Sequence, residues 1–303
     1  MTTTALFASV ALATCSLPAG DIKDPQTWGD YFLDKYAAER AAALENIEPG
    51  PAPLPQPRTV LLITGVTIPA EWFDPIVARL QRDGFNPVVW EPPALLSGDL
   101  FENSHRLADV VDQIRAETGE EKIDILAECT GGLLARHYIQ SLGGDQYIDR
   151  MVTFISPQHG VPKAKLAASL VSWPALYDLT PGSEFLTTVN SAPLPDNVAF
   201  TSIYTCTDEY IQPYTTSIIP GAKNIGLCDK FVGHYQFFYD PEIYKIMHAE
   251  LVAPLAANDG DDKGDDGTMS TDTTDAGGCS TTGGGDVGAL LVLGALVALR
   301  RRK

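Results

Sequence analysis

The chain has 303 residues, an apolar fraction of 45% and a formal net charge of −18. This length allows one large α/β domain or two small ones, and the apolar fraction is sufficient for a hydrophobic core. The acidic balance disfavours a nucleic-acid partner. The sequence shows no Gly-rich phosphate loop, and it predicts neither a metal site nor a cofactor.

The first twenty residues, MTTTALFASVALATCSLPAG, are small and apolar and end in a plausible cleavage region. They are similar to a secretory signal, although they lack its basic start, so the true start lies upstream or the signal is atypical. Residues Leu12-Ala13-Thr14-Cys15 could also be the lipobox of a lipoprotein, but Thr14 before the cysteine fits that motif poorly. We predict a signal peptide over residues 1–20.

Residues 21–57 read as an N-terminal helix followed by a linker. Asp24 is a good N-cap and Pro25 is tolerated at the first helical position, so a helix is predicted from there to about Asn46. Its apolar residues on one face are Trp28, Phe32, Tyr36 and Leu44. The segment EPGPAPLPQP, residues 48–57, predicts a stiff extended linker because proline fixes φ and excludes helix.

Between residues 58 and 256 short apolar runs alternate with helix-length amphipathic segments, which predicts an α/β fold with a mostly parallel sheet and helices on both faces. The continuously apolar strands indicate burial on both sides. The predicted strands are Thr59–Thr64, Pro87–Trp90, Ile123–Glu128, Met151–Ile155, Val198–Thr205 and Asn224–Cys228. The predicted helices are Glu71–Asp83, Ser104–Thr118, Gly131–Leu142 and Pro241–Val252. Residues 160–195 are too long and apolar for a simple crossover, and we interpret them as a lid or pocket wall.

Residues 257–286 are predicted to be a disordered acidic linker, since this Gly/Asp-rich segment has little to bury. The apolar block Val287–Leu299 is too short for a comfortable membrane span, but it is followed by four basic residues, which fits a transient anchor. Residues 287–303, with Cys279 ahead of them, are similar to the MYXO-CTERM sorting tails of myxobacterial surface proteins. We therefore expect a secreted or cell-surface protein with possible anchoring through this tail.

A nucleophile, an acid and a histidine follow in the order that acyl transfer on an α/β-hydrolase scaffold requires. Cys129 follows a strand and opens a helix in the sequence AECTGG, whose small residues suit a sharp elbow. Asp208 follows the next-to-last strand and His234 follows the last one. The other histidines lie within predicted helices or before the acid. A lone cysteine on such a pattern could also be a small buried apolar residue.

Two backbone N–H groups are candidates for an oxyanion hole, those of Thr130 and Val66. Gly65 would let the loop after the first strand approach the nucleophile. Cys206 and Cys228 lie near the ends of strands that should be neighbours, so a disulfide between them is geometrically reasonable in an oxidising compartment.

The domain resembles the bacterial triacylglycerol lipase family of class 2 type from about Val60 to Leu251. The resemblance rests on VLLITGV, AECTGGLLARHYI, GGDQYIDRMVTFISPQHGVP, PGSEFLTTVN, IYTCTDEYIQPY and GHYQFFYDPEIY. It implies an α/β-hydrolase acting on carboxylic esters of lipids or polyesters, with a triad of Cys129, Asp208 and His234 and oxyanion donors at Val66 and Thr130.

This chain departs from that family at the site itself. Cysteine replaces the usual serine, Thr64 replaces the usual His before Gly65, and Glu128 replaces the usual His before the nucleophile. The family's Pro-His-x-Gly element reads Pro157-Gln158-His159-Gly160 in this chain. Dienelactone hydrolases and polyhydroxyalkanoate synthases are similar in carrying a cysteine at such an elbow. As the last strand residue, Glu128 is expected to point away from Cys129 and to form a structural salt bridge.

The leading hypothesis is an exported ester hydrolase that forms a thioester on Cys129. Two alternatives stay open: an acyltransferase or polyester-active enzyme of the same fold, and a catalytically impaired, lipase-like surface binding protein. A helix N-terminus and a neighbouring histidine would favour the thiolate, and both partners of the nucleophile are retained. These features favour an enzyme.

Overall fold

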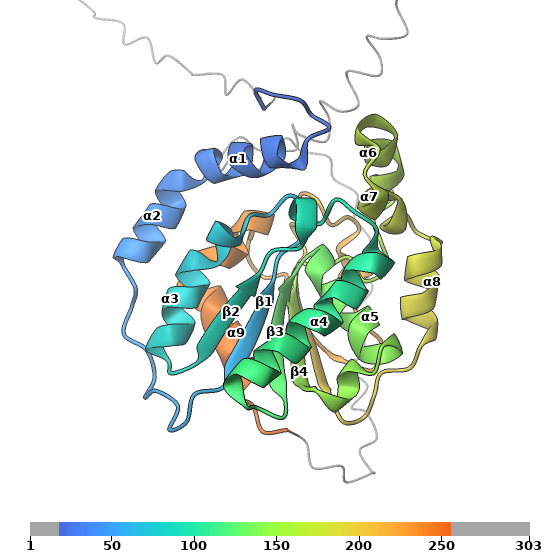
Figure 1. Cartoon of the computed structure of the whole chain (residues 1–303). Coiled ribbons are helices and arrows are strands. Elements are labelled where there is room, and N and C mark those ends of the chain that lie inside the picture. Colours follow the sequence, from blue (N-terminus) through green and yellow to red (C-terminus); the bar gives the residue numbers. More distant parts are fainter. Residues whose placement is uncertain (1–17, 256–303) are drawn as a thin grey trace, which may run out of the picture.

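Six parallel strands form the central sheet, in the order β2-β1-β3-β4-β5-β6 (Figure 1). The computed structural model describes residues 18–255. The strands are β1 Thr59–Ile63, β2 Asn86–Trp90, β3 Ile123–Glu128, β4 Ile148–Phe154, β5 Ala199–Thr205 and β6 Lys223–Leu227. All six predicted strands are present, which confirms the α/β fold class.

The strand order reverses between β1 and β3, and this reversal positions the site. The chain runs outward from β1 to β2 and then returns to pair β3 on the other side of β1, with Leu62 opposite both Val89 and Leu126. The loops that leave β1 and β3 therefore diverge and leave room between them at the carboxyl ends of the strands. Gly65 and Cys129 lie on these two loops.

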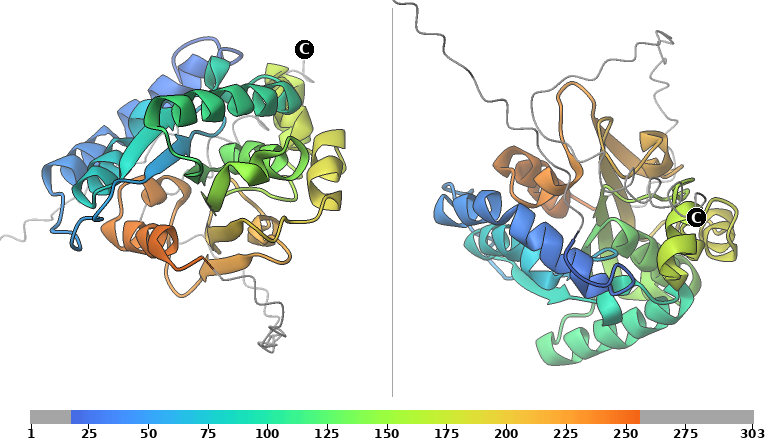
Figure 2. Two further views of the ribbon diagram at one scale, coloured as in Figure 1. Left: turned by 60° about the horizontal axis from the view of Figure 1, so that its bottom comes forward. Right: turned by 90° about the horizontal axis from the view of Figure 1, so that it is seen from above.

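Helices cover both faces of the sheet (Figures 1 and 2). Their bounds are α1 Pro25–Lys35, α2 Ala37–Glu45, α3 Asp74–Arg82, α4 Leu100–Thr118, α5 Thr130–Ser141, α6 Ala164–Val171, α7 Pro174–Asp178, α8 Glu184–Ser191 and α9 Pro241–Val252. One core cluster joins α4, α5 and α8 to one face of the sheet, and a second joins α1, α3 and α9 to the other. The central strands are buried throughout, as their apolar sequences predicted.

The N-terminal segment differs from its prediction. Instead of one helix there are two, interrupted at Tyr36, where ψ is 19°. Trp28 and Phe32 are buried, but Leu44 is exposed, so the predicted apolar face extends over α1 only. Asp24 caps α1 by accepting a hydrogen bond from the backbone N–H of Gln26, as its residue type predicted.

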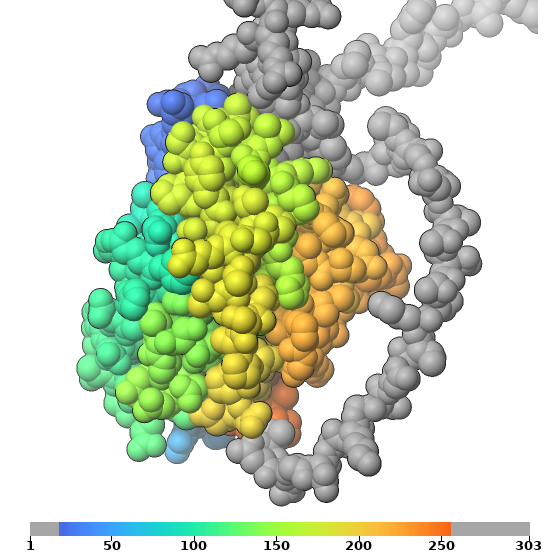
Figure 3. All heavy atoms as spheres, turned by 90° about the vertical axis from the view of Figure 1, so that its right-hand side faces the viewer, coloured from blue at the N-terminus to red at the C-terminus, as the bar shows by residue number. Residues whose placement is uncertain are grey.

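Residues 160–195 contain the three short helices α6, α7 and α8, which form one side of the molecule (Figure 3). Leu166 and Tyr177 of these helices are exposed, whereas other apolar residues of the segment are buried. Trp173 is buried, and its indole N–H donates to the backbone oxygen of Lys23, just before α1. The insertion and the N-terminal segment are thereby joined at the same end of the sheet.

The predicted signal peptide at residues 1–20 lies almost wholly outside the described residues. The acidic linker and the apolar tail, residues 257–303, lie outside them as well. Within residues 18–255 no helix has the length and apolar character needed to span a membrane.

Candidate active site

Cys129 lies at a sharp turn between β3 and α5. Its backbone has φ 47° and ψ −121°, a conformation that is uncommon for a residue with a side chain and that is often found at functional sites. The turn is fixed by hydrogen bonds from the Cys129 N–H to the Phe154 oxygen at 3.0 Å and from the Gly132 N–H to the Cys129 oxygen at 3.1 Å. The strand–turn–helix arrangement predicted for this segment is thus present.

Two glycines make the turn sterically possible. A Cβ atom on Gly131 would lie 2.7 Å from the Ile63 backbone oxygen, and one on Gly65 would lie 2.9 Å from the Cys129 Cβ. The Ile63 oxygen and the Cys129 Cβ are not at the end of a flexible side chain, so they could not move aside. The loop after β1 and the start of α5 can therefore approach closely only because Gly65 and Gly131 lack a side chain.

Asp208 and His234 come together from the ends of neighbouring strands. Asp208 follows β5, and His234 opens a short 3₁₀ helix, His234–Phe238, beyond β6. Their side chains meet at 2.8 Å between His234 Nδ1 and Asp208 Oδ2. The other carboxylate oxygen, Oδ1, accepts the backbone N–H groups of Tyr210 and Ile211, both at 2.8 Å. Both carboxylate oxygens of Asp208 therefore have hydrogen-bond partners.

The second ring nitrogen of His234 faces the cysteine. His234 Nε2, Cys129 Sγ and a carboxylate oxygen of Glu128 lie within 4.8 Å of one another. Cys129 is half-buried and lines a pocket, whereas His234 is only 4% exposed. The three residues predicted to form a triad are consequently neighbours.

The two candidate oxyanion donors come from different segments that line the same pocket as Cys129. Thr130 is the first residue of α5, where an N–H has no intrahelical acceptor. Val66 lies on the loop after β1 and lines the same pocket as Cys129 and Thr130. Among the described residues neither N–H has a hydrogen-bond acceptor, so both are available to a ligand.

Glu128 does not point away from Cys129, so that expectation is wrong, and its ionic partner is His234 of the site itself. Its Oε2 accepts the Gly65 N–H at 2.7 Å, and its Oε1 lies 3.3 Å from His234 Nε2. Side chains alternate along a strand, so Glu128 shares a sheet face with Leu126, which packs in the cluster that contains α9 and the residues after His234. This alternation was the signal in the sequence that could have placed Glu128 beside His234.

The carboxylates change the proton affinities of the site. Burial alone would lower the pKa of His234, but the charge and hydrogen bond of Asp208, together with Cys129 and Glu128, raise that pKa well above its ordinary value. Burial, and then the charge of Glu128, raise the pKa of the Cys129 thiol. Burial also raises the pKa of Glu128. From the sequence, the helix N-terminus and the histidine are expected to favour the thiolate. His234 does lower the pKa of Cys129, but burial and the charge of Glu128 raise it by more.

A cavity of about 180 Å³ opens over the sulfur. Its apolar wall comes from α1, the loop after β1, the segment 160–195 and the loops that carry Asp208 and His234. The α1 residues Trp28 and Phe32 and the insertion residues Val171 and Trp173 contribute to it. An apolar pocket ending at a polar cluster is the usual form of a small-molecule site.

No family model matches the chain. In sequence it is 25% identical over 211 residues to Lipase B of Pseudozyma antarctica, covering 68% of this chain and 61% of that protein, so it spans about three fifths of that relative. Among solved structures, the mature Bacillus licheniformis lipase BlEst2 superposes with a TM-score of 0.54 at 16% identity over 67% of this chain and 96% of that chain. Aspergillus fumigatus lipase B superposes with a TM-score of 0.55 at 20% identity over 63% and 51%.

The chain has the α/β-hydrolase fold. Together with the sequence match, this relates it to lipases. In this α/β-hydrolase domain the elbow, the acid and the histidine each follow a strand in the order that the fold uses.

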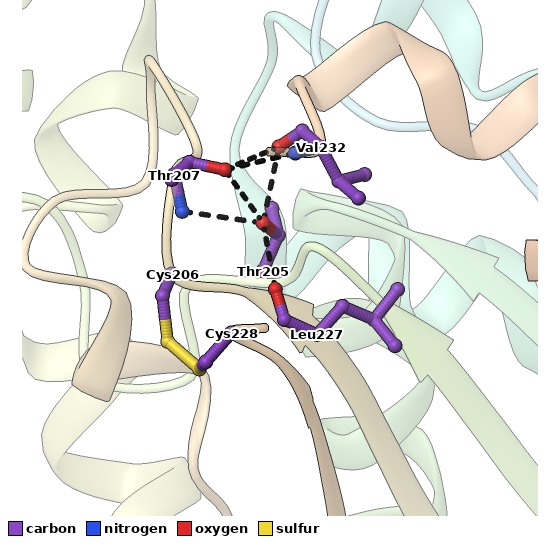
Figure 4. Close-up of a disulfide and its surroundings, with 6 residues drawn as sticks. All are labelled: Thr205, Cys206, Thr207, Leu227, Cys228 and Val232. Atoms are coloured by element: carbon purple, nitrogen blue, oxygen red, sulfur yellow. Dashed lines mark hydrogen bonds between the residues drawn. A yellow bond between two sulfur atoms is a disulfide. The ribbon is translucent and has the colours of Figure 1, made fainter. Parts of the chain in front are cut away.

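A disulfide between Cys206 and Cys228 joins the two loops that carry Asp208 and His234 (Figure 4). Threonine hydroxyls reinforce this connection. Thr207 Oγ1 donates to the Val232 oxygen at 3.0 Å and accepts the Val232 N–H at 2.9 Å. Thr205 Oγ1 donates to the same oxygen at 3.0 Å. The relative position of the acid and the histidine is thus fixed by covalent and polar contacts.

Replacing both disulfide cysteines by alanine is expected to lower the free energy of unfolding by about 3 kcal/mol, because the bridge closes a loop of 22 residues in the unfolded chain. Urea denaturation of the purified chain measures this change. The control is reduction of the native protein followed by alkylation, which should give a similar loss. A change below about 0.5 kcal/mol would contradict a stabilising bridge.

Proposed function

We propose that the chain is a carboxylic ester hydrolase in which Cys129 is the nucleophile, His234 is the base and then the acid, and Asp208 orients His234. The observation that carries the proposal is the 2.8 Å contact between His234 Nδ1 and Asp208 Oδ2, which leaves the other ring nitrogen directed at the cysteine on its elbow. The lipase relatives support an ester of a lipid or another apolar acid as substrate, and the apolar pocket fits such an acyl chain.

The reaction has two steps. His234 Nε2 takes the thiol proton as Cys129 Sγ attacks the ester carbonyl, and the N–H groups of Val66 and Thr130 stabilise the oxyanion. The imidazolium then protonates the alkoxide leaving group, which leaves a thioester on Cys129. His234 Nε2 then takes a proton from a water molecule as this water attacks the thioester. The carbon–sulfur bond breaks, the carboxylic acid leaves, and the imidazolium returns its proton to Cys129 Sγ, which restores the thiol and the neutral histidine.

We also propose that the protein works outside the cytoplasm. The disulfide supports this location, since such bonds persist in oxidising compartments. The signal-like start and the anchor-like tail of the sequence agree with it. Fractionation of cells that produce the full chain, with detection in medium, envelope and cytoplasm, tests the location, and recovery in the cytoplasm alone would contradict it.

Turnover of p-nitrophenyl esters of increasing acyl length, before and after iodoacetamide, tests the enzymatic proposal. We expect turnover that the reagent abolishes, and an acyl adduct on the Cys129 peptide in rapidly quenched samples. Turnover that survives complete alkylation of Cys129 would contradict the thioester. Binding of esters without turnover would favour the lipase-like binding protein, and transfer of the acyl group to an added alcohol faster than to water would favour an acyltransferase.

The substitution Glu128→Gln is expected to move the rising limb of the pH–rate profile towards lower pH. The reaction needs a neutral His234. The contact with the Glu128 carboxylate helps to raise the pKa of His234, and the charge of Glu128 helps to raise the pKa of Cys129. Removal of that charge lowers both pKa values, so the reactive protonation state is reached at lower pH. The profile of kcat/KM against pH measures the shift, with the exposed Glu102→Gln as the matched control. An unchanged midpoint would show that Glu128 carries no charge in the free enzyme.

A further inference from the structure

Three groups with electron-pair donors lie together at the pocket: the Cys129 thiol, the His234 imidazole and the Glu128 carboxylate. One ligand atom of each lies within 4.8 Å of the other two, and His234 Nε2 and Glu128 Oε1 are 3.3 Å apart. Asp208 accepts a hydrogen bond from the Nδ1–H group of His234, so in a neutral His234 the Nε2 atom carries no proton and presents a lone pair. A thiolate, an imidazole lone pair and a carboxylate repel one another unless a proton or a cation lies between them.

Glu128 Oε1 points at His234 Nε2 in this cluster and has no hydrogen-bond donor when His234 is neutral. The side chain of Glu128 is fully buried, and among the described residues no hydrogen bond to Oε1 is formed while His234 is neutral; its polar neighbour is His234 Nε2 at 3.3 Å, which can donate to it only when the imidazole is protonated. A buried carboxylate oxygen without a donor is unfavourable, and a coordinated cation is one of the few ways to compensate for it. The ester hydrolysis proposed above needs no acid at this position.

The spacing of these atoms suits a tetrahedral ion. Zn–N and Zn–O bonds of about 2.0–2.2 Å at a tetrahedral angle place the two ligand atoms about 3.3–3.4 Å apart. The observed separation of Nε2 and Oε1 is 3.3 Å. The corresponding Zn-bound sulfur and nitrogen lie about 3.5–3.6 Å apart, and the three ligand atoms here lie within 4.8 Å of one another.

The surroundings match those of a catalytic-type metal site. The Nδ1 contact with Asp208 fixes the tautomer of His234, and the Gly65 N–H at 2.7 Å fixes the Glu128 carboxylate. All three candidate ligands line the pocket, so a fourth coordination position would face it. A thiolate and a carboxylate neutralise a divalent ion, and the sulfur–nitrogen set favours zinc-class ions over Mg²⁺ or Ca²⁺.

We propose that Glu128, Cys129 and His234 form an open three-ligand site for Zn²⁺ or a similar thiophilic divalent cation, and that a bound cation removes Cys129 from thiol chemistry. Binding exchanges the thiol proton, released to solvent, for an S–metal bond. The nucleophile and His234 Nε2 are then both occupied. Metal-loaded and acylated forms are therefore mutually exclusive.

The test uses the full chain, stripped with a chelator and with its disulfide intact. Titration with Co²⁺ should give one equivalent of binding with a sulfur-to-cobalt charge-transfer band, and Zn²⁺ should displace it. Zn²⁺ should also slow alkylation of Cys129 by iodoacetamide at least about tenfold, measured on the Cys129 peptide. Loss of a ligand in Glu128→Gln or His234→Ala should weaken Co²⁺ binding about tenfold or more. The exposed Asp229→Asn and His105→Ala are the matched controls and should bind Co²⁺ as the native chain does.

A charge-transfer band that persists in Cys129→Ala would place the metal elsewhere, for example on the acidic tail or its cysteine, and would overturn the proposal. Unchanged affinity in Glu128→Gln, or alkylation of Cys129 at the same rate with and without Zn²⁺, would overturn it as well. Melting temperatures of the variants confirm that each is folded. Neither readout needs ester turnover, so an inactive protein that binds Co²⁺ through Cys129 would contradict the hydrolase and support the metal site.

Discussion

Cys129→Ala is expected to lower kcat for a p-nitrophenyl ester by about a thousandfold or more, because Cys129 is the only free cysteine among the described residues and lies at the elbow. Alanine can occupy the same backbone conformation about as well as cysteine, so the fold should be retained. What remains would be the small acceleration supplied by the oxyanion donors and the pocket. Initial rates at saturating ester, with active protein quantified by its melting transition, measure the loss.

The matched control for this variant is Cys279→Ala, which removes a thiol that lies outside the described residues. Its turnover and its sensitivity to iodoacetamide should equal those of the native chain. A Cys129→Ala protein that keeps more than about a tenth of the native kcat would exclude the thioester mechanism. A water-based or metal-based mechanism would then have to be considered for the same pocket.

Asp208→Asn is expected to lower kcat by about a thousandfold. Oδ1 of Asp208 accepts two backbone N–H groups, so the amide of the variant must keep its oxygen there and turn its NH₂ towards His234 Nδ1. Nδ1 then becomes an acceptor and the ring proton moves to Nε2, which cannot take the thiol proton. The substitution therefore changes the tautomer of His234 and leaves the shape of the site as it is.

The exposed Asp229→Asn, on the loop that leads to His234, is the matched control and should leave kcat unchanged. Single-turnover rates separate acylation from deacylation, and both should fall because both use the same nitrogen. A loss below about tenfold in Asp208→Asn would mean that Cys129 is already a thiolate and needs no base. That result would contradict the raised pKa of its thiol.

Local sequence patterns were sufficient for most of the fold. Strands such as Ile123–Glu128 and helices such as Pro241–Val252 have the predicted bounds, because an apolar run or an Asp-Pro cap acts over a few residues. The order of Cys129, Asp208 and His234 along the chain also predicted which loops would meet, since parallel strands end at one edge of a sheet. The sequence alone therefore determined the fold class and the candidate triad.

The surroundings of the sulfur depended on tertiary structure. Glu128 reaches Gly65 and His234 because the sheet pairs β1 with β3 and because the last 3₁₀ helix returns to that face, contacts that join residues 63 and 106 positions apart in sequence. Burial then raises the pKa of Cys129. Whether a helix N-terminus or a buried carboxylate dominates at a thiol depends on distances and solvent access, and only the folded chain sets these.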